Sequence, residues 1–301
     1  MYSRRRLLLV LVVSACCTLA QAELRTDIEF ARVGSESLKL DASIPNGPGP
    51  FPTAIIVHGG AWRAGDKQFS GVKPLFEPLS KAGFAWFTIN YRLAPKRRAP
   101  GSAEDAGTST RTNYLTAQVE DVETAVRWVK SHAGEYKVDT KRMVLIGESA
   151  GAHLVAMVAV QNKAATRVAA VVPFYGPFDL QAMAEAARQV APSASRVFAD
   201  LVGAVGMDDD SYYALIRNAS PINHVRKGLP HFLLIHGTAD KTVPYSQSPT
   251  MCEKIRSAGG ACEVFAVEGA DHGIGKWETD PAFQAYKAKM IDWLRVTLRT
   301  K

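Results

Sequence analysis

The chain has 301 residues, of which 47% are hydrophobic and 22% charged, which is ordinary for a soluble globular protein and excludes a disordered chain. Its formal net charge is +7, and residues 1–22 contain three arginines and no acidic residue, so residues 23–301 carry +4. This modest charge, without a stripe of Lys and Arg interleaved with aromatic residues, argues against binding to nucleic acid.

The first 22 residues have the parts of a secretory signal peptide. Arginines precede an apolar run at 7–13, and Ala20 and Ala22 have the small-x-small spacing of a cleavage site. The apolar run is shorter than the roughly 20 residues that cross a bilayer, so we expect no stable membrane span. The sequence predicts an exported mature chain, periplasmic or secreted. The stretch VSAC leaves a lipoprotein anchored through Cys16 as an alternative.

Two of the four cysteines remain after removal of the signal peptide. They are Cys252 and Cys262, ten residues apart. In an oxidising compartment such a pair can form a disulfide, provided that the two Cα atoms lie within about 7 Å of each other. Two buried thiols are the alternative.

The predicted elements begin with two antiparallel strands at 27–33 and 37–44, where apolar and polar residues alternate. After residue 50, short apolar runs alternate with helical patterns. The runs that predict buried strands are 53–59, 84–91, 142–147, 168–175, 231–237 and 262–267, and the helical patterns are 70–82, 117–132, 150–161, 244–258 and 280–299. This alternation favours one α/β domain over residues 23–301, with a mostly parallel sheet covered by helices on both faces.

Two stretches interrupt the alternation. Residues 96–116 are polar and form a stretch too long for a simple connection from strand to helix. They predict a loop near the functional site. Residues 178–222 hold weakly amphipathic helical pieces after the sixth predicted strand. Because ligands of doubly wound sheets bind at the carboxyl ends of the strands, this stretch predicts a small cap over that edge.

Residues 147–151 read GESAG, between an apolar strand and an apolar helix. Glycine lacks the Cβ that would block a sharp turn, so Gly147 and Gly151 allow strand and helix to approach while Ser149 is exposed at the corner. The pattern predicts that Ser149 is a nucleophile. A surface serine in an ordinary turn is the alternative.

A serine nucleophile needs a base, and the base needs an orienting acid. Asp240 follows the predicted strand 231–237, and His272 follows the predicted strand 262–267. The chain order serine, aspartate, histidine is the one that successive strand ends impose in the hydrolase fold. We therefore expect Ser149, Asp240 and His272 to form a catalytic triad, with Asp179 as the alternative acid.

The stretch VHGGAW at 57–62 follows a strand, and its small residues allow backbone amides to face a substrate oxygen. We expect the amides of Gly60, Ala61 and Ala150 to form an oxyanion hole. Four aromatic residues are candidates for packing against an aryl group of the substrate, with a core or cap position as the alternative for each: Trp62, Tyr175, Tyr212 and Tyr213. Neither HExxH nor a pair of CxxC motifs occurs, so no metal site is expected.

Six motifs occur in order along the chain: HGGAW, NYRLAP, VEDVETAVRWV, GESAGAH, HGTADKTVP and DHG. In this order they resemble the hormone-sensitive-lipase-like group of α/β-hydrolases and its bacterial feruloyl-esterase-like relatives, over residues 37–297. The resemblance implies an α/β-hydrolase fold with an eight-stranded sheet, a serine triad, hydrolysis of small-molecule carboxylic esters and no cofactor. The sequence departs from the group's pattern in having HGGAW without a third glycine, and in the stretch 96–116.

Together these features predict an exported serine carboxylesterase that hydrolyses short-chain or aryl esters through an acyl-enzyme. The short pocket is expected because the cap stretch supplies PFDL and SYYAL among charged and small residues. An arylformamidase is an alternative that HGGAW and the triad suit equally, although export disfavours it. A ligand-binding protein that keeps the fold without the chemistry is another. The sequence carries no signal for an oligomeric state.

Overall fold

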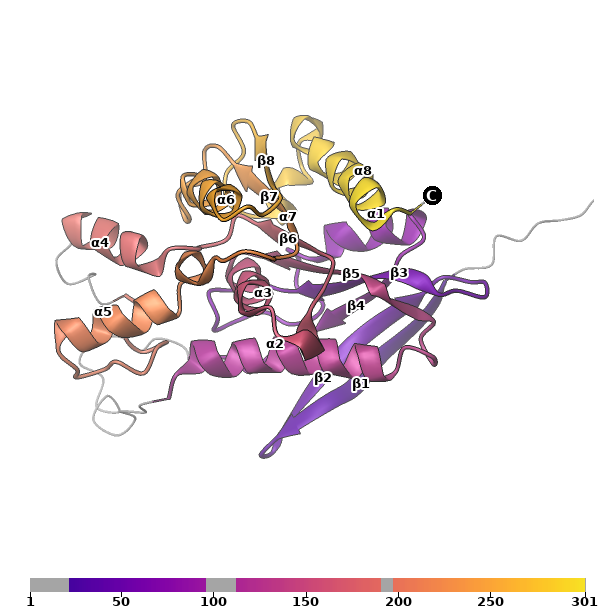
Figure 1. Ribbon diagram of the computed structural model, residues 1–301, viewed down its shortest axis with the longest axis horizontal. Coiled ribbons are helices and arrows are strands. Elements are labelled where there is room, and N and C mark those ends of the chain that lie inside the picture. The colour runs from indigo at the N-terminus through magenta and orange to yellow at the C-terminus, as the bar shows by residue number, and fades with distance from the viewer. Residues whose placement is uncertain (1–21, 96–111, 191–196, 301) are drawn as a thin grey trace, which may run out of the picture.

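The computed structural model describes residues 22–95, 112–190 and 197–300 (Figure 1). Residues 1–21, which hold Cys16 and nearly all of the predicted signal peptide, and most of the stretch 96–116 lie outside the described residues. Within the described part of the chain, no helix is both long and apolar enough to cross a membrane.

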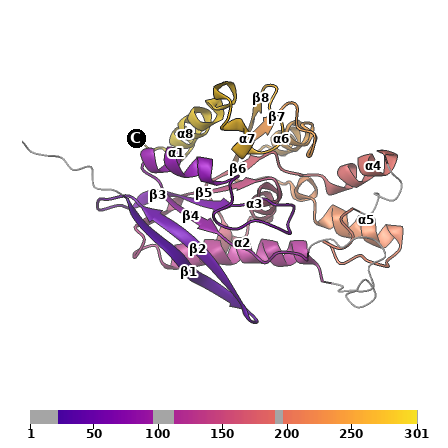
Figure 2. The ribbon, with the colours of Figure 1, turned by 180° about the vertical axis from the view of Figure 1, so that it is seen from behind.

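In the described residues, eight strands form one sheet with the order β1-β2-β4-β3-β5-β6-β7-β8. In chain order the strands are β1 (Glu23–Val33), β2 (Glu36–Ile44), β3 (Phe51–Val57), β4 (Ala85–Ile89), β5 (Val138–Glu148), β6 (Ala170–Phe174), β7 (His231–Gly237) and β8 (Cys262–Val267). The pairs β1–β2 and β2–β4 are antiparallel, and all pairs from β4 to β8 are parallel. The long strands β1 and β2 project beyond the rest of the sheet (Figure 2).

The central strands are buried because their apolar side chains meet a core on both faces of the sheet. In β3, Ile55 and Val57 belong to one core, whereas Ala54 and Ile56 belong to the other, and all four are 0% exposed. Successive side chains of a strand point to opposite faces, so a continuous apolar run requires a cover on each side. The mostly parallel sheet that the sequence predicts is confirmed.

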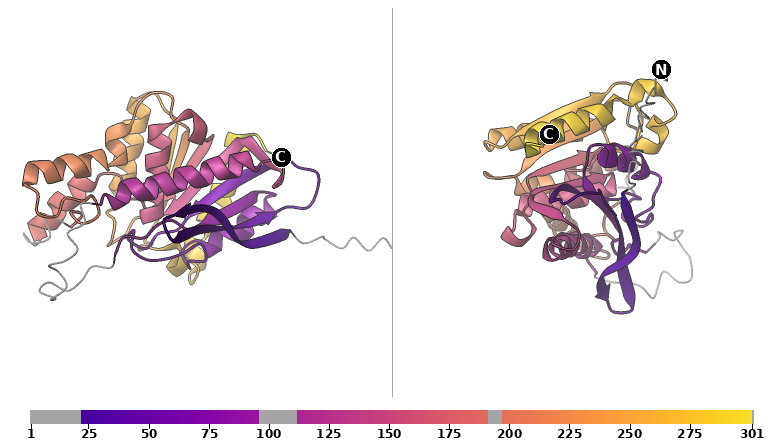
Figure 3. Two further views of the ribbon diagram at one scale, coloured as in Figure 1. Left: turned by 90° about the horizontal axis from the view of Figure 1, so that it is seen from below. Right: turned by 90° about the vertical axis from the view of Figure 1, so that its right-hand side faces the viewer.

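Helices supply that cover (Figures 1 and 3). One core contains side chains of α2 (Tyr114–Ser131), α3 (Ala150–Gln161) and α6 (Gln247–Ser257). The other core contains side chains of α1 (Phe76–Lys81), α7 (Ile274–Trp277) and α8 (Ala285–Leu298). Two short 3-10 turns also lie on the chain: η2 (Ala164–Thr166) precedes β6, and η4 (Pro221–His224) precedes β7.

Two predicted helices are shorter than their patterns indicated. The pattern 70–82 gives a 3-10 turn η1 (Lys73–Leu75) followed by α1, and the pattern 280–299 gives a 3-10 turn η5 (Pro281–Phe283) followed by α8. Each turn has a proline in its first or second position. Proline lacks the amide hydrogen of an ordinary helix and fixes φ, which suits it to a first turn but limits extension of the helix in the N-terminal direction.

The chain between β6 and β7 carries two more helices, α4 (Leu180–Val190) and α5 (Asp209–Asn218). They lie together to one side of the sheet in Figure 1, where the sequence predicts a small cap after the sixth strand. The predicted cap of about 178–222 corresponds to this connection, of which residues 191–196 are outside the described residues.

The two remaining cysteines are paired. A disulfide joins Cys252 in α6 to Cys262 at the start of β8, with the Cα atoms 5.4 Å apart. The sequence leaves open whether these cysteines pair, because their spacing along the chain does not fix the distance between a helix and a neighbouring strand. The disulfide fastens α6 to the strand that leads to His272.

Candidate active site

The serine of GESAG lies at a sharp turn between β5 and α3. Ser149 has φ +52° and ψ −118°, a conformation that a residue with a side chain rarely adopts. A Cβ on Gly147 would lie 2.4 Å from the carbonyl oxygen of Gly151, and a Cβ on Gly151 would lie 2.2 Å from that of Val57. The two glycines are therefore needed for the close approach of strand and helix, as the sequence predicts.

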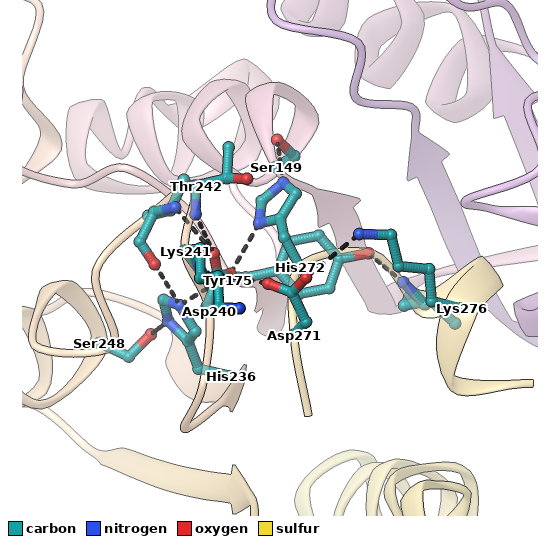
Figure 4. Close-up of polar contacts among 12 residues, drawn as sticks. Ser149, Tyr175, His236, Asp240, Lys241, Thr242, Ser248, Asp271, His272 and Lys276 are labelled. Atoms are coloured by element: carbon teal, nitrogen blue, oxygen red, sulfur yellow. Dashed lines mark hydrogen bonds and ion pairs between the residues drawn. The ribbon is translucent and has the colours of Figure 1, made fainter. Parts of the chain in front are cut away.

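Three predicted residues meet at the carboxyl ends of β5, β7 and β8 (Figure 4). Nε2 of His272 lies 3.0 Å from Oγ of Ser149, and Nδ1 of His272 lies 2.7 Å from Oδ2 of Asp240. With Nδ1–H donating to the carboxylate, Nε2 is free to accept the hydroxyl proton of the serine. This is the geometry of a nucleophile, a general base and an orienting acid.

The carboxylate of Asp240 is held by several donors. Its Oδ1 accepts hydrogen bonds from the backbone N–H groups of Thr242 and Val243, each at 2.8 Å. Its side chain is fully buried, and Oδ2 also lies 3.3 Å from Nε2 of His236. Burial raises the pKa of Asp240, but hydrogen bonds from His236, His272 and the backbone outweigh burial and leave the pKa below its usual value. Asp240 is therefore ionised at neutral pH.

His236 also lies against the carboxylate of Asp240. It is fully buried, with Nδ1 2.8 Å from Oγ of Ser248 and Nε2 3.0 Å from the carbonyl oxygen of Val243. Its proximity to Asp240 means that the acid has two histidine neighbours. The signal available in the sequence is its position four residues before Asp240, at the end of the same strand.

Two other aspartates near the site are engaged elsewhere. Oδ1 of Asp179 accepts a hydrogen bond from the backbone N–H of Ala182 at 3.0 Å, in the first turn of α4. The carboxylate of Asp271 accepts from the backbone N–H of Lys241 and forms an ion pair with Lys276. The structure therefore places Asp240, rather than the alternative Asp179, beside the imidazole of His272.

The loop after β3, where the sequence predicts an oxyanion hole, has an unusual backbone. Gly60, Ala61 and Trp62 have φ values of +102°, +52° and +64°. A Cβ on Gly60 would lie 2.1 Å from the carbonyl oxygen of Ala64, so only glycine fits there. None of the described residues accepts a hydrogen bond from the backbone N–H of Gly60, Ala61 or Ala150. These three amides are the ones that the sequence predicts will bind a substrate oxygen.

Glu148, the residue before the serine, is a buried carboxyl group that sequence reasoning missed. It is 3% exposed, and its Oε1 accepts a hydrogen bond from the backbone N–H of Gly59 at 2.5 Å. Burial raises the pKa of Glu148, although the hydrogen bond from Gly59 acts in the opposite direction. The sequence feature that could have identified Glu148 is a charged residue inside the GESAG motif, at the end of a buried strand.

Three of the four aromatic residues expected to face an aryl group are buried. Tyr175 and Tyr212 are 0% exposed, so they present no surface to a substrate, and the core position is the one the structure shows. Trp62 is 6% exposed, and its Nε1 donates to Nδ1 of His153 at 3.3 Å. Tyr213 is partly buried beside Tyr212, with ring centroids 5.2 Å apart. An aromatic residue near a motif can either face a substrate or fill the core, and the fold decides which of the two occurs.

The cap connection packs against the loop after β3. The rings of Trp62 and Phe198 meet edge to face with centroids 6.0 Å apart, and Arg63 forms an ion pair with Asp200 at 2.6 Å. Nε2 of His153 lies 2.8 Å from the carbonyl oxygen of Ala219, which precedes η4. The cap therefore restrains the loop that carries the expected oxyanion amides.

Comparisons with known proteins agree with this fold. The BD-FAE family model matches residues 40–116 and 107–255. The probable carboxylic ester hydrolase LipM of Mycobacterium tuberculosis is 29% identical over 229 residues, which cover 72% of this chain and 48% of the relative. Esterase LipC of the same organism is 29% identical over 239 residues, which cover 75% of this chain and 53% of the relative. The chain thus spans about half the length of these curated relatives.

Solved structures match nearly the whole chain. A truncated form of a carbohydrate esterase from gut microbiota has a TM-score of 0.74 and 27% identity, and the match covers 94% of this chain and 98% of that one. Esterase 2 of Thermogutta terrifontis, in its native form, has a TM-score of 0.69 and 24% identity, with 94% of both chains covered. Because the family model matches more than half of the chain and the fold agrees, the chain belongs to the BD-FAE family of α/β-hydrolases.

Proposed function

We propose that the protein is a serine carboxylesterase that hydrolyses short-chain or aryl esters through an acyl-enzyme. One observation carries the proposal: the hydrogen-bonded series Ser149, His272, Asp240, with distances of 3.0 Å and 2.7 Å. LipM, LipC and the gut carbohydrate esterase are all named as enzymes that hydrolyse esters, which supports ester hydrolysis as the reaction.

In the proposed mechanism, His272 takes the proton of Ser149 as its Oγ attacks the ester carbonyl carbon. The carbonyl oxygen becomes an oxyanion, which accepts hydrogen bonds from the amides of Gly60, Ala61 and Ala150. The tetrahedral intermediate then collapses, His272 gives its proton to the departing alkoxide, and an alcohol leaves. Water attacks the acyl-enzyme, with His272 again taking a proton, and the acid is released as Oγ regains its hydrogen.

Export is part of the proposal. The signal-peptide pattern of residues 1–22 supports it, and so does the disulfide between Cys252 and Cys262, because disulfides persist in oxidising compartments. The short-chain or aryl preference is supported by the composition of the cap stretch, which supplies PFDL and SYYAL among charged and small residues. The cap residue Phe198 packs against Trp62 of the loop after β3.

The test is a panel of esters with purified protein and its Ser149→Ala variant. We expect turnover of p-nitrophenyl acetate and butyrate by the parent, and a loss of several orders of magnitude in the variant with unchanged circular dichroism. N-formylkynurenine belongs in the same panel, because a formamide that outpaces every ester would establish the arylformamidase alternative. Activity of the variant within tenfold of the parent would refute Ser149 as the nucleophile.

A further inference from the structure

Glu148 connects the nucleophile turn to the oxyanion loop. It precedes Ser149 in the chain, yet its side chain accepts a hydrogen bond from the backbone N–H of Gly59, 89 residues away. Gly59 immediately precedes Gly60, whose amide we expect to bind the oxyanion. An ionisable side chain that is 3% exposed costs free energy to bury unless hydrogen bonds compensate for the lost water.

Two glycines make room for this carboxyl group. A Cβ on Gly59 would lie 2.3 Å from Oε1 of Glu148, and a Cβ on Gly71 would lie 2.9 Å from the same atom. Neither glycine has a positive φ, so backbone conformation does not explain the absence of a side chain. The space is shaped around Glu148 by two different segments of the chain.

A second neighbour of Glu148, Tyr175, bonds to the loop that carries His272. The hydroxyl of Tyr175 is fully buried, and burial raises its pKa; the neighbouring Glu148 carboxyl raises it further. The oxygen of that hydroxyl accepts a hydrogen bond from the backbone N–H of Ile274 at 2.8 Å. Ile274 lies two residues after His272, and the rings of Tyr175 and His272 are 4.6 Å apart (Figure 4). Glu148 thus adjoins the nucleophile, bonds the loop after β3 and neighbours a tyrosine that bonds the loop of His272.

We propose that Glu148 is a positioning residue, which holds the oxyanion loop and the His272 loop in register with Ser149 through Gly59 and Tyr175. This inference rests on the proposed function and deepens it. Catalytic groups that are displaced by about 1 Å lose on the order of 10²-fold in rate, so the contacts act on kcat.

A double-mutant cycle tests the connection. Glu148→Gln keeps the shape of the side chain but replaces one carboxyl oxygen by an amide N–H₂, and Tyr175→Phe removes the hydroxyl alone. With p-nitrophenyl butyrate, we expect each change to lower kcat at least tenfold with KM within about threefold of the parent. We expect the double variant to be no slower than the worse single variant, because the two residues act as one unit.

A buried glutamate elsewhere provides the matched control. Glu123 in α2 is also 3% exposed and forms an ion pair with Lys163 at 2.7 Å. Glu123→Gln should lower thermal stability and leave kcat within twofold of the parent. If Glu148→Gln behaves in the same way, with stability lost and kcat kept, Glu148 is only a packing residue and the inference is wrong.

A second measurement needs no substrate. Amide hydrogen exchange followed by NMR reports on the N–H groups of Gly59 and Ile274, and we expect exchange at least tenfold faster at Gly59 in Glu148→Gln and at Ile274 in Tyr175→Phe. Faster exchange in a protein that hydrolyses no ester would support the positioning role and overturn the esterase proposal. Parent-like exchange and parent-like kcat in an active esterase would overturn the positioning role alone.

Discussion

Replacing Asp240 by asparagine should inactivate the protein through the tautomer of His272. Oδ1 of Asp240 accepts from two backbone N–H groups, those of Thr242 and Val243, each at 2.8 Å. The oxygen of the asparagine must stay at that position, because an amide N–H₂ there would face two donors. The N–H₂ group therefore takes the place of Oδ2, 2.7 Å from Nδ1 of His272.

The size of the loss follows from this forced orientation. An amide that donates to Nδ1 makes Nδ1 an acceptor, so the imidazole carries its proton on Nε2, which faces Ser149 at 3.0 Å. A base that is already protonated on that nitrogen cannot accept the serine proton. The same substitution in other serine triads lowers kcat about 10⁴-fold, or about 5 kcal/mol of transition-state stabilisation, and we expect a similar loss here.

The assay is steady-state hydrolysis of p-nitrophenyl butyrate by parent and Asp240→Asn, with circular dichroism and thermal unfolding of both. Asp271→Asn is the matched control, since Asp271 is a partly exposed carboxylate in the base loop whose partners are Lys241 and Lys276. We expect the control to keep kcat within about threefold of the parent. A loss below tenfold in Asp240→Asn, or a larger loss in Asp179→Asn, would refute the assignment of the acid.

Three further predictions concern stability, substrate and processing. Burial lowers the pKa of His58 and of His153 to about 4, so between pH 6.5 and pH 4 the unfolded chain binds more protons. The contribution of these two histidines to the free energy of unfolding is complete above pH 6.5. As the pH falls it should be lost by about 1.4 kcal/mol per pH unit for each histidine, and urea unfolding at pH 7 and pH 5 measures this loss. Aryl esters from acetyl to butyryl should have a much higher kcat/KM than palmitoyl esters, and equal values would contradict the short pocket. Mass spectrometry of the exported product should give a chain that begins at Glu23, whereas the mass of a diacylated Cys16 would establish a lipoprotein.

Much of the candidate site could be predicted because its signals are local. The turn at Ser149 depends on Gly147 and Gly151 within five residues, and the loop after β3 depends on Gly60. Asp240 and His272 were identifiable because each lies in the loop after a strand, and parallel strands bring their carboxyl ends to one edge of the sheet. Here chain order and strand periodicity carry the necessary spatial information.

Other features depend on distances between segments far apart in the chain. Pairing of Cys252 with Cys262 requires that α6 pack close to the start of β8. The Cα atoms of the two cysteines are 5.4 Å apart. Whether Tyr175 and Tyr212 face a substrate or the core depends on which helices cover them. A pattern of residue types does not encode these neighbours, so core and pocket remained alternatives for each aromatic residue.

Residue patterns were sufficient to predict the sheet, the turn that exposes Ser149 and the order of the three residues that meet there. The packed fold was needed to find what supports them: His236 beside Asp240, and Glu148 beside Gly59. The reason is physical. A turn or a strand is specified by steric and hydrophobic preferences of neighbouring residues, whereas the burial of a charged side chain is tolerated only where donors from distant segments converge on it.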